Sequence, residues 1–165
     1  MLIAGTHAAH IERAARGSRV FWPGVQGPSV IPAGARELSW QSGQACIGVR
    51  IAGSGGAAIR PGHKGYRAVP FNCVLLGYSL IADQPGSIVF DIFRSSTGVP
   101  GRGDTLCSLA AFRPALAEAQ WNEDVVLFGW NTVLKKDDML GFECVSAATI
   151  TSVTLTLFLQ RPGQP

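Results

Sequence analysis

The chain has 165 residues, of which 47% are hydrophobic and only 15% are charged, and its formal net charge at pH 7 is +3. This length predicts a single domain whose core needs no metal or disulfide support. Few charged side chains are available to coat a surface, so we expect many buried strands together with a surface partly covered by neighbouring copies. Residues 1–64 carry seven basic side chains against two acidic ones. This asymmetry favours docking of the front part onto an acidic protein surface, ahead of nucleic acid.

Neither a signal peptide nor a membrane-spanning helix is predicted. The apolar start Met1–Ala4 is soon followed by histidines, a glutamate and arginines. The longest apolar stretch, Val74–Ala82, is far shorter than the roughly 20 residues that span a bilayer. The four cysteines are widely spaced, without a C-x-x-C pair, which indicates reduced thiols and no zinc site. They are Cys46, Cys73, Cys107 and Cys144.

The front of the chain predicts one short helix followed by an extended arm. The helix is expected over His7–Arg16, with Thr6 as its N-cap and Gly17 just beyond its end. Arg19–Trp40 is interrupted by Pro and Gly, which favours an extended conformation. We expect apolar side chains of this arm to bind a partner, and the alternative is that its aromatic rings pack on their own domain. The predicted partner-binding residues are Phe21, Trp22, Val25, Val30 and Ile31.

From Ala45 onward the pattern changes to short apolar runs separated by turns. Asp83–Ser87 predicts a reverse turn, with Pro85 and Gly86 at positions that suit a type II turn, so the flanking strands are expected to form a hairpin. The last strand alternates apolar and polar residues, which indicates one buried face. The expected strands are Cys46–Ile51, Tyr66–Phe71, Val74–Ala82, Ser87–Arg94, Val125–Trp130, Met139–Val145 and Thr149–Gln160.

These elements predict an all-β fold: an antiparallel β-sandwich with jelly-roll-like connections, an extended N-terminal arm and one short helix. The arm with its helix comprises residues 1–44, and the sandwich comprises residues 45–165. Ser95–Asp104 is expected to be a loop. Thr105–Ala119 has a helix-like composition but contains Pro114, so it is expected to be irregular.

No catalytic, cofactor-binding or metal-binding set is predicted, so we do not expect an enzyme. The three histidines, His7, His10 and His63, lie in the basic front part of the chain and in none of the expected strands of the sandwich, which leaves these strands without a catalytic base. His7 and His10 share a helix face, but no cysteine or carboxylate converges on them, which favours a solvated or docking role. Asp137 and Asp138 stand beside two lysines, which favours turn capping over paired-acid chemistry.

Nucleic acids and sugars are the two kinds of ligand that exposed aromatic side chains could bind. Nucleic acid would need arginines interleaved with aromatics on one surface, and residues 65–160 are acidic, with six basic side chains against nine acidic ones. A sugar ring would stack on Trp121 or Trp130 if either were exposed. The alternative for both tryptophans is a place in the core or in an interface.

Five runs of residues, in the same order along the chain, carry a resemblance to a known module. Gly65–Leu159 resembles a module of structural proteins of tailed phages or phage-like particles, and its most specific element is Ala-Asp-Gln-x-Gly-Ser-Ile-Val-x-Asp-Ile at Ala82–Ile92. The resemblance implies a β-sandwich of fibre or decoration proteins, oligomers that are often trimers, and no catalytic motif. The runs are Gly65–Cys73, Gly77–Arg94, Gly129–Thr132, Asp137–Val145 and Thr149–Leu157.

The leading prediction is a virion structural protein, made in the bacterial cytoplasm, that serves as a fibre, spike or capsid-decoration component. Its arm is expected to hold a capsid, portal or tail protein of the same particle, while the sandwich is displayed as a homo-oligomer, with a trimer favoured. The alternative is a receptor- or carbohydrate-binding tip module in which Trp121 and Ser95–Asp104 contact a host surface glycan. A depolymerase is disfavoured by the missing base and the unclustered acids.

Overall fold

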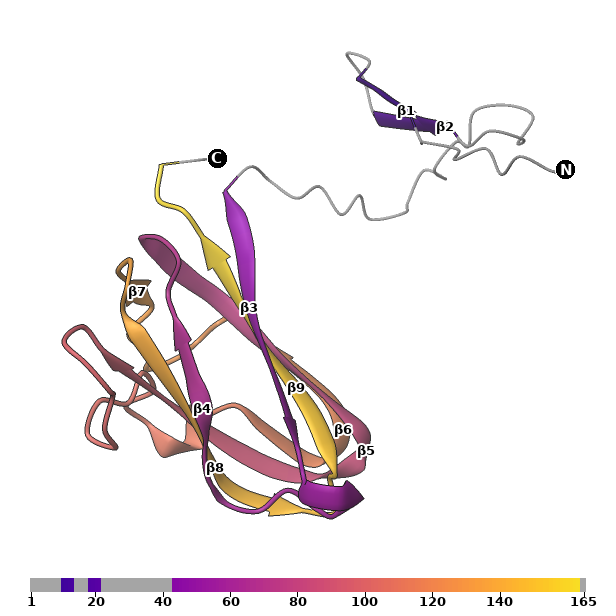
Figure 1. Cartoon of the computed structure of the whole chain (residues 1–165), viewed down its shortest axis with the longest axis vertical. Coiled ribbons are helices and arrows are strands. Elements are labelled where there is room, and N and C mark those ends of the chain that lie inside the picture. Colours follow the sequence, from indigo (N-terminus) through magenta and orange to yellow (C-terminus); the bar gives the residue numbers. More distant parts are fainter. Residues whose placement is uncertain (1–9, 14–17, 22–42, 164–165) are drawn as a thin grey trace, which may run out of the picture. The chain divides into compact units, whose positions relative to one another are not determined.

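The computed structural model describes residues 10–13, 18–21 and 43–163 (Figure 1). The chain divides into two compact units, Met1–Ser39 and Trp40–Pro165. In the first unit, β1 (His10–Arg13) pairs antiparallel with β2 (Ser18–Phe21). The helix predicted over His7–Arg16 is therefore wrong for residues 10–13, and its other residues lie outside the described ones. So short a helix is marginal in water, whereas strand pairing satisfies the backbone directly.

The second unit is antiparallel β structure. Seven strands within residues 43–163 form one sheet in the order β3-β9-β5-β8-β4, with β6 and β7 also paired to β5. This sheet curls into a half-barrel. The strands are β3 (Gln44–Ala52), β4 (Gly62–Ala68), β5 (Cys73–Ser95), β6 (Ala115–Asp124), β7 (Val133–Leu134), β8 (Met139–Ala148) and β9 (Ser152–Gln160), and two short 3-10 helices are η1 (Ser54–Gly56) and η2 (Ala110–Phe112). The all-β, antiparallel prediction is confirmed at this level.

Strand β5 is the centre of the curled sheet. It runs for 23 residues, and its first half, up to Ala82, pairs with β9, whereas its second half, from Ser87, pairs with β8. Strand β6 pairs with both halves. The hairpin predicted at Asp83–Ser87 is therefore wrong, because the two halves are parts of one strand that turns sharply at the lower end of the body (Figure 1).

Long-range contacts turn the predicted reverse turn into a corner of β5, which comprises Asp83–Gly86. The Asp83 carboxylate accepts hydrogen bonds from the backbone N–H groups of Thr151 (3.3 Å) and Ser152 (3.1 Å). The Gln84 amide donates to the backbone oxygen of Thr149. The corner is thus tied to the β8–β9 turn, which comes 65 to 69 residues later in the chain.

Gly86 is required in this corner by space. A Cβ atom at this position would lie 2.7 Å from Cγ1 of Ile150 and 2.8 Å from the backbone oxygen of Ala148. Both distances are shorter than ordinary van der Waals contact. The Pro85-Gly86 pair therefore serves close approach of two chain segments, and not the hairpin turn that its local chemistry predicts.

The hydrophobic core lies inside the curl. The alternation predicted for the last strand is confirmed, since the four apolar side chains on its predicted buried face are at most 1% exposed. Three apolar side chains of the second half of β5 are buried to the same extent, as their alternation predicts. These side chains are Val153, Leu155, Leu157 and Leu159 in β9, and Ile88, Phe90 and Ile92 in β5.

Two predictions for this part of the chain are wrong. Strand β6 (Ala115–Asp124) begins inside Thr105–Ala119, which was expected to be irregular, whereas Val125–Trp130 is a loop and not the expected strand. Strand β6 ends because Oδ1 of Asp124 accepts hydrogen bonds from the N–H groups of Val126 (2.8 Å) and Leu127 (3.3 Å), which bends the chain out of the sheet.

Strand β4 begins four residues before the predicted Tyr66–Phe71 strand and ends at Ala68. His63 consequently lies in the sheet, with its ring centroid 4.1 Å from that of Tyr66. The prediction that no histidine lies in the strands of the sandwich is therefore wrong. Among the described strands, β4 pairs only with β8 and so forms an edge of the sheet. Its charged side chains Lys64 and Arg67 disfavour pairing of this edge with another chain.

Candidate binding groove on strand β6

An open groove of about 520 Å³ runs along β6. This strand pairs with β5 on one edge, and its other edge has no strand partner within the described residues. Several alanines line the groove, and their small side chains leave its floor open. The lining residues are Tyr78, Ala111, Phe112, Arg113, Ala115, Ala117, Ala119, Trp121, Asn122, Glu123 and Asp124.

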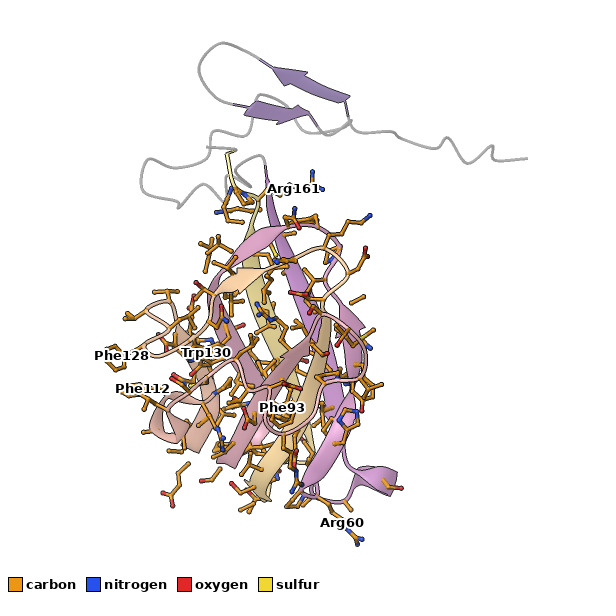
Figure 2. All side chains as sticks on the ribbon, turned by 90° about the vertical axis from the view of Figure 1, so that its left-hand side faces the viewer. Arg60, Phe93, Phe112, Phe128, Trp130 and Arg161 are labelled. Atoms are coloured by element: carbon orange, nitrogen blue, oxygen red, sulfur yellow. The ribbon has the colours of Figure 1, made fainter. Side chains whose placement is uncertain are left out.

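One wall of the groove is the segment around η2. The indole Nε1 of Trp130 donates to the backbone oxygen of Phe112 (3.0 Å), and the Trp130 ring stacks on Tyr78 with centroids 5.8 Å apart. The Phe112 ring lies 4.9 Å from that of Phe128. Figure 2 shows Phe112, Phe128 and Trp130 on one side of the body. The wall is thus held by aromatic packing and by one indole hydrogen bond.

A buried ion pair holds the same wall to β5. The guanidinium Nη2 of Arg113 lies 2.6 Å from Oδ2 of Asp91, whose side chain is 5% exposed. Oδ1 of Asp91 accepts from the Thr105 hydroxyl (2.6 Å) and from the backbone N–H of Ile92 (2.9 Å). Because both carboxylate oxygens are occupied, Asp91 anchors the wall to the sheet.

The far end of β6 carries the exposed and polar part of the groove. Trp121 is 59% exposed, and its position pairs with Ile81 of β5. Glu123 pairs with Ser79 and is also exposed, and neither its carboxylate nor the indole N–H of Trp121 has a partner among the described residues. The alternation of a strand therefore places Trp121 and Glu123 on the same face.

Two contacts fix this polar end in place. The Asn122 amide donates to the backbone oxygen of Ala115 (2.9 Å), although the two residues stand seven positions apart on β6. Gly77 allows the end of β6 to approach β5, since a Cβ atom there would lie 2.6 Å from the backbone oxygen of Asp124. The polar end is therefore set by one side-chain hydrogen bond within β6 and by close backbone packing against β5.

Tyr78 forms a neutral, buried part of the groove. Burial is the largest cause that raises the pKa of Tyr78 to about 12, and the negative charge of Asp124 acts in the same direction. Burial also raises the pKa of the Cys73, Cys107 and Cys144 thiols. These three cysteines are buried free thiols, while the free Cys46 is exposed.

Three carboxylates elsewhere in the body have structural partners. Asp83 and Asp91 hold the contacts given above, and Oδ2 of Asp138 accepts from the backbone N–H of Lys135 (2.8 Å), as the turn-capping prediction required. Within the described ranges, no three His, Cys, Asp or Glu side chains are placed to share a metal ion. Among the described helices, none has the length and apolar character needed to cross a membrane.

The structure brings together only part of the predicted site. Trp121 is exposed and lines the groove, whereas Ser95–Asp104, predicted to act beside it, contributes no lining residue. Arg102 of that loop lines a separate cavity of about 210 Å³, where its guanidinium Nη2 lies 2.6 Å from Oε1 of Glu143. Phe112 and Glu123 were not predicted. The available signal was the adjacent acidic pair Glu123 and Asp124, which begins two positions after Trp121.

The predicted partner-binding residues of the arm cannot be placed in a site. Phe21 contributes its backbone to β2. Its side chain, together with Trp22, Val25, Val30 and Ile31, lies outside the described residues, so their role stays a prediction. His10 lies in β1, and His7 lies outside the described residues.

The comparisons with known proteins add no family. No family model matches the chain, and neither a curated protein nor a solved structure matches it. The geometry of the groove and the sequence resemblance are therefore what a functional proposal rests on.

Proposed function

We propose that the chain is a structural protein of a tailed phage or phage-like particle, and that it displays the β-domain on the particle surface. Residues 1–44 serve as the attachment arm for a capsid, portal or tail protein. Residues 45–165 form a jelly-roll-like variant of the β-sandwich, assemble as a homo-oligomer with a trimer favoured, and carry no catalytic role.

The observation that carries this proposal is the structural role of the most specific stretch of the resemblance, Ala82–Ile92. Its Asp83 and Gly86 build the corner of β5, and its Asp91 anchors the wall of the groove. A motif whose polar members hold backbone and ion-pair contacts specifies a scaffold. The division of the chain at residues 39 and 40 further supports separate parts for attachment and display.

The proposal is tested on particles from the organism that encodes the chain. An antibody raised against residues 43–163 is expected to label purified particles at a fixed surface position in electron microscopy. Mass spectrometry should find the full chain in the same particles. If particles lack the chain while cells contain it, the proposed function is wrong.

The role of the arm is tested separately. A chain without residues 1–42 is expected to keep the β-sheet signal in circular dichroism, because the core described above lies within residues 43–163. This truncated chain should be absent from particles. Its incorporation at the level of the full chain would contradict attachment through the arm.

A further inference from the structure

The β6 groove has the features of a site for a hydroxyl-rich ligand, and we propose that it binds neutral oligosaccharides. This activity goes beyond attachment and display, since it assigns a ligand class to a surface of the displayed domain. Four features of the groove support this proposal: an aromatic platform, hydrogen-bond acceptors beside it, a local negative charge and an open shape.

The aromatic platform is Trp121. Its 59% exposure leaves most of a large apolar ring in water, which is costly unless something covers it. Its cross-strand neighbour Ile81 is 54% exposed and extends the same apolar strip. The flat C–H face of a pyranose ring has the size and polarity to stack on such a strip, with its hydroxyls still directed to the sides.

The acceptors stand beside this platform. The Glu123 carboxylate has no partner among the described residues, and Asp124 uses only Oδ1 to cap the following turn, which leaves Oδ2 as an acceptor. Neighbouring hydroxyls of a sugar can donate to one carboxylate in a bidentate manner, and such charge-assisted hydrogen bonds are the strong ones. The free indole N–H of Trp121 adds a donor.

The local charge selects among sugars. Arg113 is the cation that lines the groove, and its charge is matched by Asp91 at 2.6 Å. Glu123 and Asp124 then leave the groove with a net negative charge. Sialylated or uronic sugars would place a carboxylate against these two acids, so repulsion favours neutral sugars over acidic ones.

The shape of the groove accepts a short chain and not a single enclosed ring. Its volume of about 520 Å³ lies within the range of about 300–1,000 Å³ typical of small-molecule sites. The groove lies along β6, and alanines at 115, 117 and 119 keep its floor free of bulky side chains. A linear oligosaccharide can therefore lie along the strand with one ring on Trp121.

The test uses the full chain in isothermal titration calorimetry. Lactose, maltotriose and chitotriose represent neutral sugars, and 3′-sialyllactose is the acidic counterpart of lactose. We expect at least one neutral sugar to bind with a Kd of about 1 mM or tighter, and 3′-sialyllactose to bind at least tenfold more weakly than lactose if lactose is that sugar. A printed array of neutral and acidic glycans extends the same comparison.

Variants separate the groove from the rest of the surface. Trp121→Ala should weaken binding by about tenfold or more through loss of the stacking surface, while Trp121→Phe retains part of it. Glu123→Gln should weaken binding of the neutral sugar and narrow the gap to its acidic counterpart. Val126→Ser is the matched control, because Val126 is 80% exposed and does not line the groove.

Specific results would overturn the proposal. They are the absence of binding by every neutral glycan on the array, equal affinity for acidic and neutral sugars, or unchanged affinity in Trp121→Ala with a wild-type circular dichroism spectrum. Because particle labelling is measured independently of sugar binding, failure of this inference leaves the proposed attachment and display untouched.

Discussion

Asp91→Asn is predicted to destabilise the β-domain strongly. The change removes the charge that faces Arg113 and leaves one amide N–H₂ group against either the guanidinium at 2.6 Å or the Thr105 hydroxyl at 2.6 Å. Breaking a buried ion pair by removal of one partner costs about 3–5 kcal/mol. The Arg113 side chain is 24% exposed, so water recovers part of this cost, and we expect a loss of about 3 kcal/mol.

Urea unfolding followed by circular dichroism measures this loss. With a slope of about 1.5–2 kcal/mol/M, the unfolding midpoint should fall by about 1.5–2 M. Asp137→Asn is the matched control, because its carboxylate is 80% exposed and its ion pair with Lys136 spans 3.9 Å. This control should change the free energy of unfolding by less than about 0.5 kcal/mol.

A double-mutant cycle tests whether the ion pair itself is responsible. Arg113→Met combined with Asp91→Asn should recover at least about 1.5 kcal/mol relative to the sum of the single changes. A loss below about 1 kcal/mol for Asp91→Asn, or additive single effects, would refute the assignment of Asp91 as the anchor of the groove wall.

Three further predictions concern the corner and the buried tyrosine. Gly86→Ala should cost about 1–3 kcal/mol in urea unfolding, since its Cβ would overlap the β8–β9 turn. Tyr78→Phe should reduce the loss of stability between pH 10 and about 12. The raised pKa of folded Tyr78 stabilises the protein below the unfolded pKa of about 10, and this stability is lost as the pH rises toward about 12. Hydrogen bonds from Thr151 and Ser152 lower the pKa of Asp83. The stability that Asp83 contributes is therefore present above the pKa of the unfolded chain and is lost as the pH falls through the folded pKa. Asp83→Asn should flatten this loss of stability in acid.

Each of these three has a result that contradicts it. An unchanged midpoint for Gly86→Ala would show that the corner relaxes without cost. Parallel stability curves of wild type and Tyr78→Phe above pH 10 would remove the tyrosine from the alkaline response, leaving the buried thiols as its source. A wild-type acid response in Asp83→Asn would mean that other carboxylates govern acid unfolding.

The sequence predicted those parts of the fold that depend on local periodicity. Alternation located the buried faces of β9 and of the second half of β5, because a half-buried strand repeats its environment every second residue. The turn prediction failed at Pro85-Gly86, where contacts with the distant β8–β9 turn override the local preference of the Pro-Gly pair. Alternation also missed β6, whose alanines carry no strand signal and whose place depends on β5.

The candidate site was predictable only in its most conspicuous residue. Trp121 was predicted as a possible sugar contact because an exposed tryptophan ring can stack on a sugar ring. Phe112 lines the groove because the next residue, Arg113, is held by its ion pair with Asp91. These two residues stand 22 positions apart, and no local sequence pattern predicts their contact. The loop at 95–104 was grouped with Trp121 on composition alone, and its Arg102 instead pairs with Glu143.

The shared central strand has a consequence for how this domain can be divided. The first half of β5 pairs with β9 and its second half pairs with β8. A chain break at residues 84–85 would therefore leave two fragments that each expose unpaired strands and apolar core residues. Neither fragment would then hold its shape alone, and denaturation should proceed in one step. Insertions and permuted termini belong in the exposed loop tip around Gly98, where the backbone carries no strand pairing.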